Sequence, residues 1–407
     1  MTAQEPSAKE YLSVELNGQL QRFLWRSENG SEFPTKVLCI DDTCTADQAL
    51  KLARSGTALV WSSDFQNARL LLQAMSRRLD KRKRTRDSSI QLQPQNSLAP
   101  AFEAYRENQK NRAQILGKLL IAIDCDHKIR LKRAPNVVDA CEQAYGVTQD
   151  AYVISLRELH GVISAFEWRK KGLAINLTAS GLAPFKLTPH FGVFSPIRGE
   201  YLKLVADCPL PKALELESTA FDIGTGTGIL ALILAKRGVK RIIATDQSAR
   251  AVLCASANVL GLGLVEKIEV MQTNLFPQLQ NPTNPQPCKA ALIVCNPPWL
   301  PSPASDALDS AVFDPASQML KGFLNALRAH LTPKGEGWLV MSDFAEHLGL
   351  RPREQFMQWI DAAGLEVLGK LDTRAEHKKA SDASDPFFSA RSKELTSLWR
   401  LGAKGEH

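Results

Sequence analysis

The sequence predicts an α/β fold for residues 186–407, with a parallel sheet and helices on both of its faces, preceded by a mixed α+β region in residues 1–185. Short apolar runs alternate with segments of helical periodicity in the second half, which is typical of a doubly wound sheet. Two of these runs end in tight tips, at 224–228 and 296–299. Because ligands bind at the carboxyl ends of strands in such sheets, both tips are candidate functional segments.

The composition indicates a globular protein without membrane segments. A length of 407 residues suits two or three domains, and 44% hydrophobic with 23% charged residues is ordinary for a soluble chain. The sequence contains no apolar run long enough to span a bilayer, and Met1–Glu5 does not begin a secretory signal. The eight cysteines form no Cys-x-x-Cys pair, so we expect reduced thiols, a cytoplasmic location and no metal site.

The N-terminal region is expected to recognise the substrate, either as one unit or through two subdomains at 1–88 and 101–185. A polar stretch with two prolines separates them. The periodicity predicts a strand at 57–61 and helices at 65–79, 101–120, 137–145 and 153–171.

One short run carries most of the net charge. Arg77 to Asp87 holds seven basic and two acidic residues, a local charge of +5 in a chain of +7. Such a run can track RNA phosphates, which would make the protein a nucleic-acid binder. The alternative is a solvated surface that keeps the protein soluble, and both interpretations stay open.

The C-terminal region alternates strands and helices. We expect strands at 219–223, 241–245, 267–271, 290–295 and 337–343, and helices at 227–237, 248–260, 316–331 and 351–363. Segments 365–371 and 396–401 are expected to form an antiparallel hairpin at the sheet edge. Between them, Pro386-Phe387-Phe388 suits either a lid over a substrate or ordinary packing.

The first tip is a glycine turn between a strand and a helix. Asp222 lies in the strand, and Gly224, Thr225, Gly226 and Gly228 lie in the turn that follows it. Glycines allow a ligand to approach the backbone closely, and N–H groups at the helix start can meet a carboxylate. Asp222 could accept a hydrogen bond from an ammonium group, directly or through water.

The next two strands end in further candidate ligand contacts. Asp246 ends the second strand, where a carboxylate can accept hydrogen bonds from two ribose hydroxyls. Asn274, with Leu275 beside it, ends the third strand and could contact an adenine edge. Such a site suits a nucleoside cofactor, and NAD is the main competitor. The usual NAD pattern needs glycine at 229, where this chain has Ile229.

The second tip, Asn296-Pro297-Pro298-Trp299, suits a site that modifies a planar nitrogen. An amide or exocyclic amine nitrogen is a poor nucleophile because its lone pair is delocalised. The Asn296 side-chain oxygen and the Pro297 carbonyl can accept hydrogen bonds from its two hydrogens. The prolines fix φ and remove competing donors, and Trp299 offers a face for stacking.

Together these motifs resemble class I S-adenosylmethionine-dependent methyltransferases with an Asn-Pro-Pro-aromatic motif, over about half of the chain, from Gly199 to Leu401. That group includes release-factor glutamine methyltransferases, ribosomal RNA amino-group methyltransferases and the methyltransferase small domain proteins. The resemblance implies a Rossmann-like, seven-stranded catalytic domain. It also implies S-adenosyl-L-methionine as cofactor and an RNA or translation-related protein as methyl acceptor.

By the same resemblance, Asp222, Gly224 and Gly226 would contact the methionine part of the cofactor, Asp246 the ribose and Asn274 the adenine. Residues Asn296, Pro297 and Trp299 would hold the acceptor. The chain departs from the family at Asn274, where Asp is commoner. It also departs at Trp299, where glutamine methyltransferases have Tyr.

We favour an RNA base as the acceptor because of the basic run. The alternatives are a protein glutamine side chain, a non-catalytic RNA-binding protein on the same fold, and an NAD-dependent oxidoreductase. Two further residues, His190 and His347, are candidate substrate contacts, although an ordinary loop histidine explains the first better.

Overall fold

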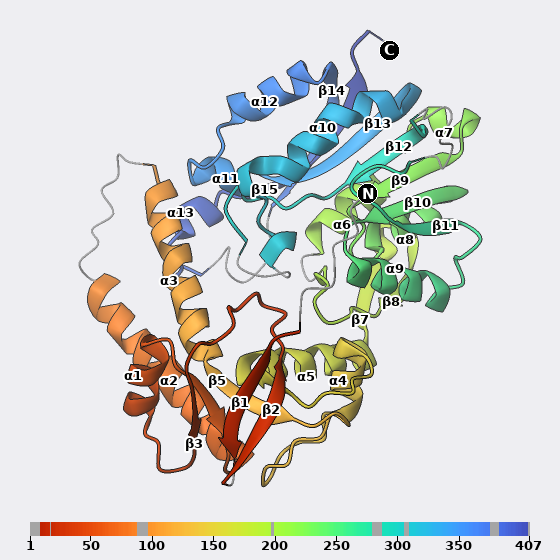
Figure 1. Cartoon of the computed structure of the whole chain (residues 1–407). Helices are drawn as coiled ribbons and strands as arrows, with labels where there is room; N and C mark the ends of the chain where they lie inside the picture. The colour runs from red at the N-terminus through yellow and green to blue at the C-terminus, as the bar shows by residue number, and fades with distance from the viewer. Residues whose placement is uncertain are drawn as a thin grey trace. The chain divides into compact units, whose positions relative to one another are not determined.

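The computed structural model describes residues 9–16, 18–87, 97–196, 199–278, 287–304, 309–374 and 382–405, without the side chains of 81–87. The chain divides into two compact units (Figure 1). The first comprises the described residues within 1–96 and 104–167, and the second those within 97–103 and 168–407. This division after residue 167 comes earlier in the chain than the predicted boundary at 185.

The first unit is built on a six-stranded sheet in the order β1-β2-β6-β5-β4-β3. Its strands are β1 (Tyr11–Leu16), β2 (Gln19–Trp25), β3 (Val37–Ile40), β4 (Ala58–Trp61), β5 (Leu119–Ile123) and β6 (Tyr152–Ser155). Its helices are α1 (Ala46–Arg54), α2 (Phe65–Asp87), α4 (Val138–Tyr145) and most of α3 (Ala99–Gly117) and α5 (Leu156–Lys171). The mixture of helices and strands agrees with the predicted α+β character.

For two helices of this region, one predicted boundary was wrong. The helix expected at 101–120 ends at Gly117, and strand β5 begins at Leu119. The helix expected at 153–171 begins at Leu156, because its first residues belong to strand β6. Both strands are short, fully buried or nearly so, and apolar, and such runs cannot be distinguished from helix by periodicity. Strands β1 to β3 were not predicted.

The basic run is helical. Helix α2 continues to Asp87, beyond the predicted end at 79, and so includes the whole run. Within the described side chains, Arg78 pairs with Asp47 at 3.0 Å. The side chains from 81 to 87 lie outside the described residues, as does the predicted linker from 88 to 96.

The second unit contains the predicted seven-stranded α/β sheet, in the order β11-β10-β9-β12-β13-β15-β14. Its strands are β9 (Thr219–Ile223), β10 (Arg241–Asp246), β11 (Ile268–Gln272), β12 (Ala290–Cys295), β13 (Leu331–Ser342), β14 (Leu365–Arg374) and β15 (Leu395–Ala403). Strands β9 to β13 run parallel, and β15 lies antiparallel between β13 and β14. The predicted antiparallel hairpin at the edge is therefore confirmed.

Helices cover both faces of this sheet (Figure 1). One face packs against α6 (Glu200–Asp207), α8 (Ile229–Lys236) and α9 (Ala249–Gly261), and the other against α10 (Gln318–His330) and α12 (Arg353–Ala362). Two separate apolar cores result, and neighbouring residues of one strand point into different cores, as Ala220 and Phe221 do. Burial on both faces explains why the strands read as continuous apolar runs.

Smaller elements complete the second unit. They are β7 (Leu173–Leu177) paired with β8 (Leu182–Leu187), α7 (Ala213–Leu216), α11 (Phe344–His347), α13 (Phe388–Arg391) and the 3-10 turns at Thr178–Ser180, Asp309–Ala311 and Pro315–Ser317. In this unit Phe102 packs edge-to-face against Phe344 and Phe387, with ring centroids 6.3 and 5.3 Å apart. The Phe387 side chain is only 3% exposed, which favours packing over a lid.

Candidate functional site

The two tips predicted from the sequence lie side by side at one edge of the sheet. Strand β9 pairs in parallel register with β10 on one side and with β12 on the other. Gly224, Asp246 and Asn296 therefore occupy equivalent positions at the carboxyl ends of three adjacent strands. Adjacent strands are about 4.8 Å apart, so groups bound at the two tips are close enough to react.

The glycines of the turn have different neighbours. Gly224, Gly226 and Gly228 have φ angles of +71°, +56° and +84°, in the left-handed region that favours glycine. A Cβ on Gly224 would lie 2.5 Å from the Met319 methyl, and one on Gly228 would lie 3.3 Å from the Ala255 Cβ. A Cβ on Gly226 would meet nothing within 4 Å. The open face of the turn is therefore at Gly226.

Asp222 is a buried carboxylate with one satisfied oxygen. Its Oδ2 accepts hydrogen bonds from the Thr225 hydroxyl at 2.6 Å and the Ala231 N–H at 3.0 Å. Its Oδ1 is buried and has no hydrogen-bond partner among the described residues. Burial raises the pKa of Asp222 to about 6, and the neighbouring Asp246 adds to the rise. A cationic ligand group would supply the missing partner and lower this pKa.

Asp246, at the end of the neighbouring strand β10, is hydrogen-bonded to the glycine turn. Its two carboxylate oxygens accept hydrogen bonds from the Gly226 N–H at 3.0 Å and the Ser248 N–H at 2.9 Å. Burial raises its pKa above the ordinary value. Each carboxylate oxygen has a further lone pair, so both can still accept from a diol.

After the third strand, Leu275 is held by a hydrogen bond to the neighbouring strand, whereas Asn274 is exposed. Strand β11 ends at Gln272, so Asn274 lies in the turn beyond it, where it is exposed. Leu275 has a φ of +60°, unusual for a leucine, and its carbonyl accepts a hydrogen bond from the Thr245 hydroxyl at 2.6 Å. The expectation that Asn274 ends the strand was therefore wrong by two residues.

The second tip is held by its own side chains. The Trp299 indole N–H donates a hydrogen bond to Asn296 Oδ1 at 2.9 Å. The Trp299 ring packs at 89° against Tyr201, with centroids 6.5 Å apart, and contacts both cores of the sheet. Pro297 and Pro298 are buried. The sequence suggested a stacking face at Trp299, and the structure adds a direct contact with Asn296.

Arg351 is a residue of this site that sequence reasoning missed. Its guanidinium donates to the Trp299 carbonyl at 3.3 Å and, more weakly, to the Ser317 hydroxyl at 3.4 Å. The side chain is only 3% exposed. Burial lowers its pKa, while Glu346 and Asp314 favour the charged form. No local pattern indicates this role, because Arg351 follows the tip by 52 residues.

A known protein family matches the part of the chain that contains both tips. Residues 190–350 match the family model described as methyltransferase small domain. The match contains both tips and Asp246, while the first compact unit lies outside it.

Curated relatives match parts of this domain. A ribosomal protein L11 methyltransferase of Clostridium perfringens (strain SM101 / Type A) is 37% identical over 87 residues, 21% of this chain and 25% of that protein. A release factor glutamine methyltransferase of Cereibacter sphaeroides is 31% identical over 172 residues, 39% of this chain and 57% of that protein. The chain thus spans a quarter to somewhat over half of their lengths.

Solved structures of methyltransferases also align with the chain. A methyltransferase from Pyrococcus furiosus aligns with 13% identity and a TM-score of 0.35, over 59% of this chain and 98% of that one. A ribosomal protein L11 methylase from Lactobacillus delbrueckii subsp. bulgaricus aligns with 20% identity and a TM-score of 0.30, over 46% and 69%.

The methyltransferase small domain implies S-adenosylmethionine as cofactor. Two features fit that molecule. The unpartnered Oδ1 of Asp222 can receive its ammonium group, and the open face at Gly226 gives its chain access to the backbone. The Asp246 carboxylate lies beside Gly226 and accepts a hydrogen bond from its N–H.

An asparagine anchors the loop that begins the domain to the glycine turn. The Asn258 side chain donates to the Thr227 carbonyl at 3.0 Å and accepts from the Thr188 N–H at 2.8 Å. The two segments are 39 residues apart in the sequence but are held by one buried amide. This residue was not predicted, because a single asparagine within a helix carries no local signal.

The two candidate histidines are not part of the tips. Burial lowers the pKa of His190 to about 4, with a smaller effect from Arg169, so its imidazole is neutral near pH 7. The ring of His347 lies 3.3 Å from an Asp343 oxygen, after strand β13.

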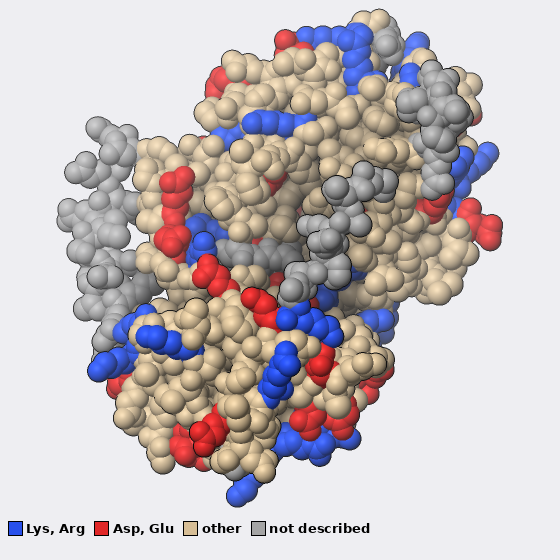
Figure 2. Space-filling model, in the orientation of Figure 1, with Lys and Arg blue, Asp and Glu red and all other residues tan. Residues whose placement is uncertain are grey.

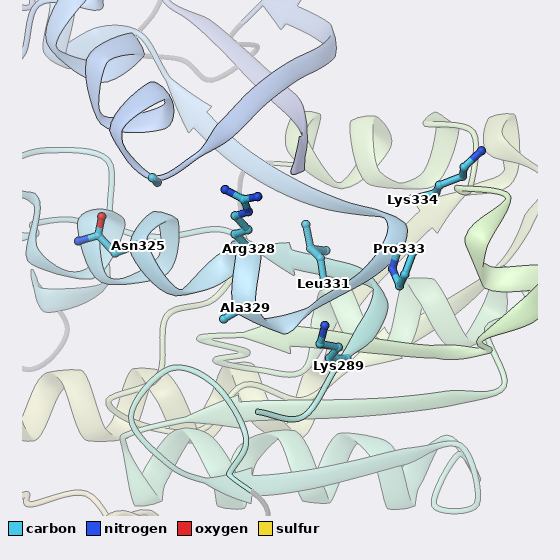
Figure 3. Close-up of a pocket in the computed structure, with 8 residues that line it drawn as sticks. Lys289, Asn325, Arg328, Ala329, Leu331, Pro333 and Lys334 are labelled. Atoms are coloured by element: carbon cyan, nitrogen blue, oxygen red, sulfur yellow. The ribbon is translucent and has the colours of Figure 1, made fainter. Parts of the chain in front are cut away.

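A cavity of about 660 Å³ lies at the other end of the strands (Figure 3). Its lining includes Lys289, before β12, Arg328, near the end of α10, and Lys334, in the first part of β13. In Figure 3 the Lys334 side chain points away from Arg328, so these cations do not converge on one point. The cavity is separate from the edge of the sheet that carries the two tips.

Within the described part of the chain, no group of three or more His, Cys, Asp or Glu residues is placed to hold a metal ion. All eight cysteines are free thiols. No described helix is long and apolar enough to cross a membrane.

Proposed function

We propose that this protein transfers a methyl group from S-adenosylmethionine to a planar nitrogen of a translation-related protein, with a glutamine side chain as the leading candidate. The observation that carries the proposal is the parallel register that puts Asn296 beside Gly224. It brings a hydrogen-bond acceptor for an amide next to the turn that suits the cofactor.

The residues of the tip would activate the acceptor nitrogen by orientation. Asn296 Oδ1 and the Pro297 carbonyl would accept its N–H bonds, which turns the nitrogen lone pair towards the cofactor. The bound cofactor supplies an electrophilic methyl group on a sulfonium. The new N–C bond would form as the bond between the methyl carbon and the sulfur breaks, and the nitrogen would release one proton to solvent. Positioning and directed hydrogen bonds would supply the catalysis.

The cofactor half of the site would use charge. Asp222 would pair with the ammonium group through its unpartnered Oδ1, and Asp246 would accept from the ribose hydroxyls. Gly226 leaves room for the methionine chain. An NAD-dependent oxidoreductase is disfavoured, because the family match is to a methyltransferase domain.

A protein acceptor has better support than RNA, which reverses the preference drawn from the sequence. The relatives described above are named for ribosomal protein L11 and for a release factor glutamine. Of the basic run, Arg78 pairs with Asp47, and the side chains from 81 to 87 lie outside the described residues. On the face drawn in Figure 2, acidic and basic side chains are mixed over the first unit.

We also propose that the N-terminal region selects the acceptor, with 186–407 as the catalytic domain. The six-stranded sheet lies outside the residues that match the family model, so it can supply contacts that the matched domain does not.

The test uses the full chain with tritiated S-adenosylmethionine and two pools from cells lacking the protein. One pool contains ribosomal proteins and release factors, and the other contains ribosomal RNA. We expect label in the protein pool, on a side chain that mass spectrometry locates. Label only in the RNA pool would reverse the acceptor assignment. Cofactor binding with label in neither pool would favour a non-catalytic protein on this fold.

A further inference from the structure

We propose that Trp299 is a positioning residue that fixes the orientation of the Asn296 carboxamide, and that Arg351 anchors this pair. This inference rests on the proposed function, because it concerns how Asn296 meets the acceptor nitrogen. It assigns Trp299 a role beyond that of a stacking surface.

The hydrogen bond between the two side chains decides which atom of the amide faces which way. An indole N–H can only donate, so the amide atom 2.9 Å from it is the oxygen. The NH₂ group of Asn296 is therefore on the other side of the carboxamide. A flipped amide would present that donor to an acceptor N–H, which would be repulsive.

The Asn296 oxygen remains able to bind a substrate. A carbonyl oxygen has two lone pairs, and the indole uses one of them. The other can accept from the nitrogen to be methylated while the indole contact stays in place. The structure therefore holds Asn296 in its acceptor orientation before any substrate binds, which lowers the cost of reaching the reactive geometry.

Trp299 is itself held by long-range contacts. Its carbonyl accepts from Arg351, and its ring packs against Tyr201 and both cores. Arg351 is buried and also contacts Ser317, which precedes helix α10. The tip is thus fixed through the main chain at Trp299 and through the side chain at Asn296.

The test removes the indole N–H together with part of the ring. Trp299→Phe keeps an aromatic ring, and we expect kcat to fall about tenfold, the effect of one ordinary hydrogen bond. Cofactor affinity, measured by calorimetry, should not change. Trp338→Phe is the matched control, since Trp338 donates to Glu336 at 3.0 Å in the core of the same sheet. We expect that control to lower stability but not kcat.

A double-mutant cycle separates positioning from general structural damage. If Trp299 acts through Asn296, Trp299→Phe should have no further effect on kcat in an Asn296→Ala background. Additive losses in the double variant would overturn the inference. So would a wild-type kcat in Trp299→Phe.

A second measurement does not need the acceptor. The Trp299 indole N–H resonance, assigned by its loss in Trp299→Phe, should exchange slowly with water in the wild type and much faster in Asn296→Ala. Equal exchange in both would contradict the hydrogen bond and the inference with it. A wild-type protein that labels no pool would instead refute the proposed function, even if this exchange behaves as expected.

Discussion

The two tips of the catalytic edge are built by different means. The glycine turn is shaped by its own backbone, with three glycines at positive φ and hydrogen bonds donated to the carboxylates of Asp222 and Asp246. The Asn296 tip is shaped by side chains, through Trp299 and the distant Arg351. The conformation of the cofactor half is therefore set mainly by a short glycine motif, whereas that of the acceptor half is set by side-chain contacts.

Their electrostatics differ in the same way. Asp222 keeps a buried oxygen without a partner and a pKa raised to about 6, which suits a cationic ligand. Asn296 is neutral, and its oxygen already accepts a hydrogen bond from Trp299. This contrast predicts that the turn governs affinity and pH dependence, while the tip governs the rate of transfer.

The largest effect on transfer is expected at the tip. Asn296→Ala removes an acceptor for the nitrogen to be methylated, and kcat should fall about 10²–10³-fold, by analogy with loss of one transition-state hydrogen bond. Cofactor affinity should stay within about twofold. The measurement is label transfer at saturating cofactor, together with calorimetry.

Asn325→Ala is a suitable control for this experiment, because Asn325 is an exposed asparagine at the cavity on the opposite end of the sheet. It should transfer methyl groups at the wild-type rate. If Asn296→Ala instead kept its kcat and bound the cofactor more weakly, the tip would govern affinity. The proposed contrast between the two tips would then be wrong.

At the turn, Asp222→Asn should weaken cofactor binding about 10–100-fold, since it removes a charged acceptor from an ammonium group. The amide oxygen can still accept from Thr225 and Ala231, so the turn should keep its shape. Calorimetry with S-adenosylmethionine measures the change. An unchanged Kd would show that the ammonium is held elsewhere.

The same variant should be more stable than the wild type at alkaline pH. The Asp222 pKa is about 6 in the folded protein against an ordinary 3.8, so the folded state binds the proton more tightly. Its stabilising contribution is present below about pH 4 and is lost as the pH rises through 6. Asp222→Asn should therefore raise Tm at pH 8, and the difference should vanish near pH 4.

Cofactor affinity of the wild type should follow the same ionisation. Only the charged carboxylate pairs with an ammonium group, so the Kd should be about tenfold weaker at pH 5 than at pH 7. Asp222→Asn should lose this dependence between pH 5 and 7. An equal slope in the variant would assign the titration to another group.

Two alanine substitutions sharpen the description of the turn. Gly226→Ala puts a methyl into the open face, whereas Gly228→Ala puts one 3.3 Å from Ala255. Both force alanine to a positive φ, at a cost of about 1–2 kcal/mol. We expect the first to weaken cofactor binding several-fold and the second mainly to lower Tm. The reverse pattern would move the open face to Gly228.

The sequence predicted the parts of the site that short motifs encode. Strands β9 and β12 were predicted at their observed bounds, and both tips follow them. Glycine, proline and an apolar run are local signals with direct backbone consequences. The order of the strands follows from general rules for α/β sheets, so the sequence could also predict that the two tips are adjacent.

The missed features depend on contacts between distant residues. Arg351 and Asn258 are single polar residues whose partners lie 52 and 70 residues away. Strands β5 and β6 were absorbed into helices because short buried runs have no distinctive period. The raised pKa of Asp222 arises from burial, which only the assembled fold reveals.

The smallest effect on transfer is expected outside both tips. Phe387→Ala removes a ring packed against Phe102 and should lower stability by about 3–5 kcal/mol, as for other buried aromatic residues. At a temperature where the variant stays folded, KM for the acceptor should not change, because the ring is core and not a lid. Phe388→Ala is the matched control, since Phe388 is only half-buried, and it should cost less stability. A raised KM in Phe387→Ala without loss of Tm would mean that this segment covers the acceptor.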